Sequence, residues 1–226
     1  MKKALCIAVI FSIFLNILCS CKDTKSFDDS LQEKTYSPVK SVVIGYPDFN
    51  STTCRLLNTA IVEHVKEMLD ISEYDESELY ADIGYRITFC SSDIVSMVFE
   101  GLYNVKSAAH PVSFFDSLTV EVESGRLLSL HDYYEIDSEF GEWVRVEYKT
   151  QACDYFSKKL NIPMEDVSNI VESEFDDIDC SQLTTRLNMA DSKNSDIHSF
   201  LTEDSVGISL PVSHALGDHC EIYLDR

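Results

Sequence analysis

The stretch from Tyr85 to Tyr134 constrains the fold of this chain most, because several strand patterns follow one another there with short turns between them. At its start, apolar residues alternate with polar ones, at Ile83, Tyr85, Ile87 and Phe89. This period of two is typical of a half-buried strand. Segments 94–103 and 114–123 have the composition of two further strands, and the turn at 123–126 begins a return. We therefore expect an antiparallel meander.

Helical patterns flank the meander. Apolar residues recur three and four apart from about Cys54 to Ile71, and a polar cluster just before them offers an N-cap at Ser51, Thr52 or Thr53. Pro163 is placed to open a further helix through Val171. Between these, a long helix is expected from about Ser138 to Leu160. Its apolar face would be formed by Trp143, Val146, Thr150, Cys153, Phe156 and Leu160.

Short β-branched runs at 41–46, 197–201, 206–212 and 220–224 predict additional strands. Together the patterns predict an α+β fold in which an antiparallel sheet is packed by two longer helices. We expect one globular unit over residues 35–226, with two lobes of about 35–110 and 111–226.

The N-terminus has the pattern of an export signal. Lys2 and Lys3 precede an apolar run from Ala4 to Leu18, which is shorter than the roughly twenty residues that cross a bilayer. The run ends in Leu18-Cys19-Ser20-Cys21, which resembles the lipobox of bacterial lipoproteins. That resemblance implies removal of residues 1–20 and a lipid on Cys21. An ordinary cleavage site or an uncleaved anchor helix are the alternatives.

Residues 21–34 are polar and without periodicity, so they are interpreted as a flexible tether. The folded part is then expected in the bacterial cell envelope, outside the cytoplasm, and on a membrane only through its lipid anchor. The 226 residues carry a formal net charge of −21. Such a chain repels nucleic acid and anionic lipid and attracts basic partners, although the charge could also serve solubility alone.

Five cysteines follow Cys21, namely Cys54, Cys90, Cys153, Cys180 and Cys220. Export permits disulfides, but an odd number leaves at least one thiol unbridged, and the pairing stays open. Cys90 and Cys153 fall on apolar faces, which favours packing as small hydrophobic residues.

Motifs of hydrolases, metalloproteases and nucleotide-binding proteins are missing from the sequence. His214, His219 and Cys220 come nearest to a metal cluster but need further ligands, so a surface loop is the preferred interpretation. The acidic clusters at 72–78 and 172–179 are interpreted as solvated loops. We therefore predict no metal, no cofactor and no enzymatic activity.

Four motifs together carry a family resemblance. They are Gly45-Tyr46-Pro47, Ala109-His110-Pro111, Ser124-Gly125-Arg126 and Leu128-Ser129-Leu130-His131-Asp132-Tyr133-Tyr134. In this order the chain, over about 40–226, resembles the extracellular domain shared by RsiV-like anti-sigma factors and the non-catalytic region of PdaC-like peptidoglycan deacetylases. The chain departs from that pattern at Ser107-Ala108, where the family usually has a glycine pair.

The resemblance implies that Tyr46, Pro47, His110, Pro111, Gly125 and Asp132 have structural or binding roles. Neither a sigma-binding segment nor a deacetylase domain accompanies the motifs, so those activities are not carried over. RsiV-like domains bind lysozyme, a small basic protein. The first hypothesis is therefore a lipoprotein that binds lysozyme or another cationic protein.

Two alternatives remain at this point. One is a glycan-binding or accessory wall-modifying protein that acts through tyrosines and His110. His110 has a more conservative interpretation, in which its imidazole bonds the backbone of the kink. As a catalytic base it would need His131 and Asp132 close by. The other alternative is a scaffold lipoprotein with an unidentified protein partner.

Overall fold

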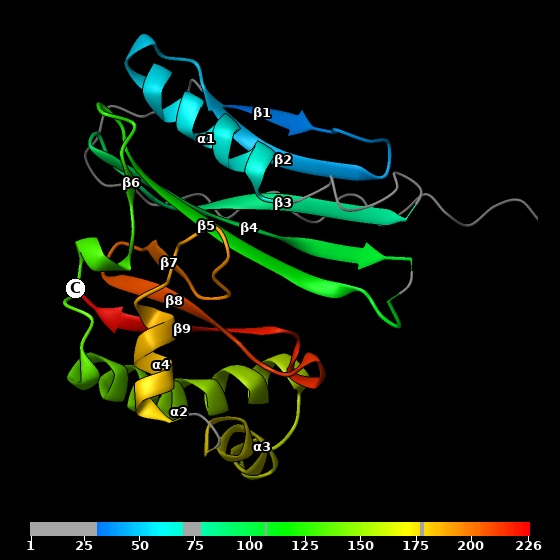
Figure 1. Ribbon diagram of the computed structural model, residues 1–226, viewed down its shortest axis with the longest axis vertical. Coiled ribbons are helices and arrows are strands. Elements are labelled where there is room, and N and C mark those ends of the chain that lie inside the picture. The colour runs from blue at the N-terminus through cyan, green and yellow to red at the C-terminus, as the bar shows by residue number, and fades with distance from the viewer. Residues whose placement is uncertain (1–30, 70–77, 107, 177–178) are drawn as a thin grey trace, which may run out of the picture.

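The computed structural model describes residues 31–69, 78–106, 108–176 and 179–226. These residues form stacked layers: one helix, a large sheet, a small sheet and a group of helices, from top to bottom in Figure 1. The fold is mixed α+β, as the sequence predicts.

The large sheet, sheet A, contains the expected meander. Its strands in spatial order are β1 (Leu31–Tyr36), β2 (Val42–Phe49), β3 (Leu79–Cys90), β4 (Ile94–Val105), β5 (Val112–Glu121) and β6 (Leu127–Leu128). The strands from β3 to β6 pair antiparallel, as predicted. β2 and β3 instead run parallel. Their connection contains α1 (Arg55–Glu67), as parallel neighbours require a crossover.

Helix α1 forms where the sequence predicts a helix. The Ser51 hydroxyl accepts a hydrogen bond from the Thr53 amide and caps the short 3-10 turn η2 (Thr52–Cys54) that leads into the helix. Leu57, Ile61 and Val65 lie on one face and are buried against sheet A. This contact forms the first core cluster of the molecule.

The second core cluster lies between the small sheet and the remaining helices. Sheet B consists of β7 (His198–Leu201), β8 (Ser205–Pro211) and β9 (His219–Asp225), all antiparallel. The helices below it are α2 (Ser138–Leu160), α3 (Met164–Asp176) and α4 (Cys180–Leu187). Two 3-10 turns, η4 (Leu130–Asp132) and η5 (His214–Leu216), precede α2 and β9.

The two sheets meet through a buried polar seam. Ser117 on β5 donates from its hydroxyl to the Ser199 carbonyl at 2.7 Å, and the Leu201 amide donates to the Ser96 hydroxyl at 2.9 Å. The neighbouring β5 residues Leu118 and Val120 instead belong to the core cluster below α1. Because side chains alternate along a strand, sheet B covers the face of sheet A that points away from α1.

The lobe boundary expected near 110–111 falls inside the β4–β5 hairpin, so residues 112–121 belong to sheet A. The change from one core cluster to the other comes between Val122 and Leu130, because β5 pairs along its whole length with β4. Within the stretch 21–34 expected as a tether, Leu31 already begins β1, which pairs with β2.

Two further local expectations are corrected. Pro47 was expected at the end of a strand but lies inside β2, opposite Glu33. A proline, which has no backbone N–H, is tolerated there because β3 pairs only with residues 42–44 of β2. On the side of β2 that faces β3, residue 47 therefore needs no hydrogen-bond donor. The backbone of 172–176, expected as an acidic loop, continues helix α3.

The expected signal peptide, Cys21, residues 22–30 of the tether and residues 72–77 of the first acidic loop lie outside the described residues. Within the described ranges, no helix combines the length and apolar character needed to cross a membrane. Cys54, Cys90, Cys153, Cys180 and Cys220 are not joined in disulfides. Cys90 and Cys153 pack against the core clusters, as their positions in the sequence suggest.

Candidate functional site

The long helix α2 is apolar on two sides, and part of the face expected to be buried faces solvent. Trp143 and Val146 are 37% and 52% exposed. The side buried against sheet B and the neighbouring helices consists of Phe140, Val144, Tyr148, Ala152 and Phe156. Both series recur at helical spacing, so periodicity alone cannot choose between them. The expected face is therefore wrong for Trp143, Val146 and Thr150 and right for Cys153 and Phe156, which lie in or against the core.

Trp143 is held in a defined position by two aromatic neighbours. Its ring lies edge-on to Tyr134 at a centroid distance of 5.7 Å and to Phe140 at 5.8 Å. Tyr134 is fixed in turn, because its hydroxyl donates to the Asp225 carbonyl at 3.0 Å. Edge-to-face packing of this kind orients an aromatic ring while part of it stays accessible.

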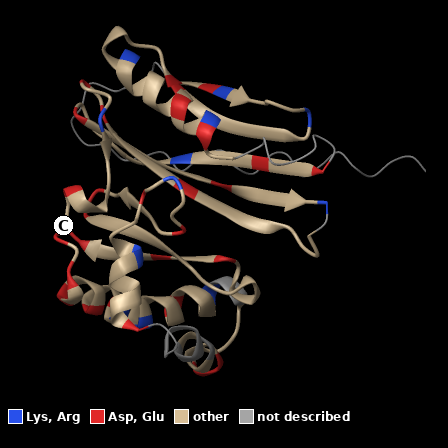
Figure 2. Ribbon diagram, in the orientation of Figure 1, with Lys and Arg blue, Asp and Glu red and all other residues tan. Residues whose placement is uncertain are grey.

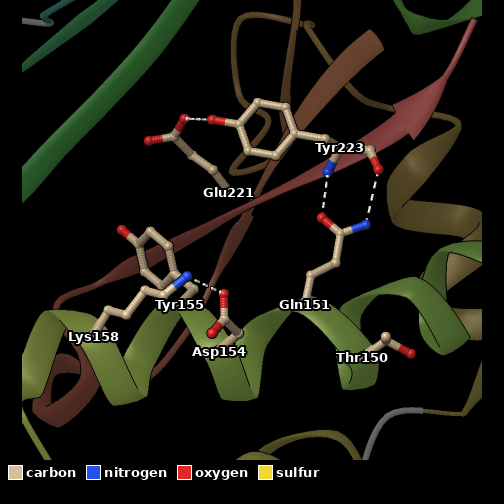
Figure 3. A pocket seen from close by; sticks show the side chains of 7 residues that line it. All are labelled: Thr150, Gln151, Asp154, Tyr155, Lys158, Glu221 and Tyr223. Carbon is tan, nitrogen blue, oxygen red and sulfur yellow. Dashed lines mark hydrogen bonds and ion pairs between the residues drawn. The ribbon is translucent and has the colours of Figure 1, made fainter.

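A groove of about 790 Å³ begins where the exposed side of α2 meets β9 (Figure 3). It is lined by Thr150, Gln151, Asp154, Tyr155, Lys158, Glu221 and Tyr223. Thr150 follows Val146 by one helical turn, so the exposed strip of α2 leads into the groove. We call Trp143, Val146 and Thr150 the outer face of α2.

Gln151 fixes the relative position of the two groove walls. Its side-chain amide accepts from the Tyr223 amide at 2.9 Å and donates to the Tyr223 carbonyl at 2.8 Å, as Figure 3 shows. The Gln151 side chain thereby makes the two backbone hydrogen bonds that a neighbouring strand would make with Tyr223 at the edge of β9. This protects the edge from pairing with another chain.

The charged groups of the groove are engaged within the protein. Lys158 lies 2.5 Å from Asp154, and the Tyr223 hydroxyl donates to Glu221 at 2.8 Å (Figure 3). Burial and the nearby Glu221 carboxylate raise the pKa of both Tyr155 and Tyr223. Both phenols therefore stay protonated near neutral pH.

Behind the groove, Arg86 of β3 joins the two sheets. Its guanidinium lies 3.5 Å from Glu100 of β4 and 3.5 Å from Glu221 of β9. Ligand atoms of Glu100, Glu221 and His219 lie within 4.8 Å of one another, close enough to hold a metal ion. Arg86 already supplies positive charge to both carboxylates, so we interpret this cluster as an ion-pair junction between the sheets.

The sequence instead proposed His214, His219 and Cys220 as the nearest approach to a metal cluster. The structure pairs His214 with Asp218, at 2.9 Å from its Nδ1 atom, and buries Cys220 in the core of sheet B. His219 approaches the carboxylates of Glu100 and Glu221. His219 and Cys220 are neighbours on β9 and point to opposite faces, while His214 lies in η5, so the three residues have separate environments.

A second polar centre, which sequence patterns did not reveal, joins three elements at Asp116 of β5. His64 Nε2 of α1 lies 3.2 Å from one carboxylate oxygen, and His198 Nδ1 of β7 lies 3.1 Å from the other. Burial opposes ionisation, but the imidazoles of His198 and His64 outweigh it and lower the pKa of Asp116 well below its usual range. Burial likewise opposes the charged form of His198, yet Asp116 raises the pKa of His198.

Asp191, which follows α4, is another carboxylate without a sequence signature. It accepts hydrogen bonds from the Leu130 amide and from the amide and hydroxyl of Ser199. Burial nevertheless raises the pKa of Asp191. Asp191 and Asp116 are both packed between elements, which indicates a role in joining layers.

The six residues of the family motifs do not gather at the groove. Tyr46 and Pro47 are part of β2, where Tyr46 packs against the first core cluster. Gly125 has a φ of 71° in the β5–β6 turn, a left-handed conformation that favours glycine. Asp132 caps η4 together with Ser129 and binds Arg126. These contacts indicate structural roles for Tyr46, Pro47, Gly125 and Asp132.

His110 and Pro111 are exposed in the β4–β5 connection. The contact that the structure gives His110 is a ring stack on His214 at 5.7 Å, and not the backbone hydrogen bond expected at the kink. His131 and Asp132 lie beyond the other end of β5, which at about 3.3 Å per residue is too far for a proton relay. His131 Nε2 instead lies 3.1 Å from the Asn188 carbonyl oxygen.

Acidic residues concentrate in the half of the chain that carries the groove. Residues 129–226 contain 21 Asp and Glu against 7 Lys and Arg, a net charge of −14. Residues 31–128, an equal length, contain 15 against 7, or −8. Helix α2 itself carries four acidic and four basic residues, and Figure 2 shows acidic positions in the turns around the C-terminus. The outer face of α2 therefore lies in the more negative half.

Comparison with solved structures supports the fold. The chain is similar to a DUF3298 family protein from Pseudomonas aeruginosa, with a TM-score of 0.52 and 12% identity over 86% of this chain and 88% of the other. A DUF3298 family member from Bacteroides fragilis matches with a TM-score of 0.41 and 14% identity over 87% and 90%. No family model matches the sequence, and no curated protein matches it either. At this identity the likeness shows the fold alone.

Proposed function

We propose that this protein is a non-enzymatic binding module, held at the bacterial cell envelope by a lipid on Cys21, that binds lysozyme or another cationic protein. The observation that carries the proposal is the net charge of −14 over residues 129–226, the half of the chain that also carries the exposed Trp143. Complementary charge increases association rates and selects basic partners. The RsiV-like motifs of the sequence favour the same class of partner.

The polar groups of the groove support binding over catalysis. Asp154 is paired with Lys158, Glu221 with Arg86 and Tyr223, and Gln151 with the β9 backbone. A general acid or base has to exchange protons with a substrate. Groups already engaged in internal contacts are better suited to maintaining a surface than to proton transfer.

Binding of lysozyme to residues 22–226, measured by titration calorimetry at low ionic strength, tests this proposal. We expect a complex whose affinity falls steeply between 20 and about 150 mM salt, because charges beyond a Debye length of about 8 Å become screened. Chemically acetylated lysozyme, which has lost its lysine charges, is the matched control and should bind much more weakly. No binding of unmodified lysozyme at low salt would refute the proposal.

Glycan binding is a second candidate, favoured by the two neutral tyrosines and the Gln151 amide along the groove. A complex with a soluble glycan would not depend strongly on salt, since its ligand is largely uncharged. Titration of wall-glycan fragments into the same protein separates the two candidates. Tight, salt-insensitive glycan binding without lysozyme binding would favour this second function.

A further inference from the structure

Three side chains from the two sheets converge behind the groove between α2 and β9. Glu100 belongs to β4 of sheet A, whereas His219 and Glu221 belong to β9 of sheet B. His219 and Glu221 are two residues apart on one strand, so their side chains point to the same face. One ligand atom from each of the three lies within 4.8 Å of the other two. In the described part of the chain, no other group of three possible metal ligands lies so close together.

Both carboxylates make their shortest contacts through one oxygen atom. Arg86 approaches Oε2 of Glu100 and Oε2 of Glu221, each at 3.5 Å, and the Tyr223 hydroxyl donates to the same Glu221 oxygen. Figure 3 shows the other Glu221 oxygen pointing away from Tyr223. The Glu221 side chain is only 10% exposed, and a carboxylate this buried is costly unless its charge is compensated. A second oxygen on each side chain is thus available to a cation.

The charges of the cluster favour a cation as well. Arg86 supplies one positive charge to two carboxylates, so one negative charge stays uncompensated there. Lys158, the basic residue that lines the groove, is paired with Asp154. The Arg86 side chain is 38% exposed, so its guanidinium has room to move when a second cation approaches.

The donor atoms select the kind of ion. Two carboxylate oxygens and one imidazole nitrogen suit Zn²⁺, whereas Mg²⁺ and Ca²⁺ prefer oxygen ligands. Bonds of about 2.0–2.2 Å place two ligand atoms of one zinc ion roughly 3.4 Å apart, so the three side chains need to approach one another slightly. Glu100 can make this adjustment, because its side chain is 38% exposed.

We propose that Glu100, His219 and Glu221 form a zinc-binding site, with Arg86 beside it as an electrostatic competitor. This inference goes beyond the proposed function and does not depend on it. The ion would cross-link β4 and β9, and hence the two sheets. Three protein ligands leave a fourth tetrahedral position to water, and because Glu221 also lines the groove, a ligand in the groove could reach that position. Sequence patterns did not reveal the site, since Glu100 lies 119 residues before His219.

Titration calorimetry with zinc chloride tests the site, on protein first treated with a chelator. Glu221→Gln removes the charge of one ligand, and Asp154→Asn removes the same charge elsewhere in the groove. We expect zinc affinity to fall about tenfold or more in E221Q and less than about threefold in D154N. In the unchanged protein, zinc at about a hundred times its Kd should raise the melting temperature by about 5 °C or more, because it binds the folded state.

Two histidine variants separate this site from zinc held at the surface. His214 is exposed, pairs with Asp218 and stacks on His110, so it is the alternative place for an ion. We expect His219→Gln to weaken zinc binding about tenfold and His214→Gln less than about threefold. Arg86→Gln should instead strengthen zinc binding, because it removes a competing positive charge. A misfolded variant could not produce that gain, and circular dichroism verifies the fold of the others.

Equal weakening in E221Q and D154N would overturn the site, because zinc would then respond to overall charge alone. A greater loss in H214Q than in H219Q would place the ion at the surface and overturn it too. Zinc affinity that stays unchanged or falls in folded R86Q would contradict the competition with the guanidinium. No zinc binding by the unchanged protein at about 1 mM would end the proposal, while lysozyme binding, measured separately, would stand or fall by itself.

Discussion

At the scale of single residues, Asp116 is a side chain on which three elements converge. It bridges His64 of α1 and His198 of β7 at 3.2 and 3.1 Å. Removing one partner of a buried charge pair leaves the other poorly solvated, which costs more than the pair contributes net. The arrangement is therefore specific to the folded state and makes stability depend on pH.

We expect the unfolding free energy to decrease as pH rises from 6 to 9. The folded-state pKa of His198 is raised above the usual 6.5, so its contribution is complete below that value and is lost as pH passes through the folded pKa. Asp116, Asp191 and Asp196 lie near His198, and their negative charges raise the pKa of His198. Urea unfolding at several pH values measures the slope.

His198→Gln should flatten this slope and cost about 1–3 kcal/mol at pH 6, where the imidazole is charged. His131→Gln is the matched control, because His131 is exposed and contacts a carbonyl oxygen. If H198Q kept the full pH dependence of the unchanged protein, the His198–Asp116 pair would not be the cause of that dependence.

At the scale of elements, the close crossing of α2 and α4 depends on Gly141. A Cβ atom added there would lie 2.1 Å from the Thr184 hydroxyl oxygen, which is held by a hydrogen bond to the Cys180 carbonyl. Alanine is the better helix former by about 1 kcal/mol, but here the neighbouring helix leaves no room for it. Packing between elements therefore outweighs local helix propensity.

Gly141→Ala is thus expected to lower stability by about 1–3 kcal/mol. Thr184→Ala removes the obstructing oxygen, so the double variant should recover most of the loss. Thermal unfolding of the two single variants and the double variant gives the coupling energy. If the stability losses of the two single variants simply added in the double variant, the helices α2 and α4 would be able to shift and accept the methyl group added at residue 141.

At the scale of the whole molecule, like charges repel one another within the fold. The net charge of −21 includes −14 in the half built around sheet B and α2. Several surface ion pairs, such as Arg126 with Glu121 and Asp132, oppose this repulsion locally. Exposed pairs of this kind contribute little, so the net repulsion should dominate the response to salt.

Raising the ionic strength from about 10 to 150 mM shortens the Debye length from about 30 to 8 Å. We expect the melting temperature to rise by about 2–4 °C, corresponding to roughly 1 kcal/mol for a chain of this size. Scanning calorimetry in sodium chloride, with an uncharged solute at equal osmolality as the control, measures the effect. A melting temperature that falls with salt would mean that the ion pairs outweigh the repulsion.

The sequence by itself determined the fold class and most local elements, although it did not predict β1 or α4. Alternation at Ile83, Tyr85 and Ile87 predicted β3, and the three-to-four spacing after Ser51 predicted α1 with its cap. These features depend on neighbours in the chain, since backbone geometry alone sets the periods of two and 3.6. The charge balance and the absence of familiar catalytic motifs are likewise properties of composition and spacing.

Only the tertiary structure decided which surfaces are covered. Two apolar series on α2 had equal claim to the core, and the position of sheet B buried Phe140 and Val144 and left Trp143 and Val146 exposed. Asp116 lies 52 residues after His64 and 82 before His198, so no local pattern could join them. Burial and ion pairing depend on contacts between distant segments, and those contacts exist only after the layers have packed.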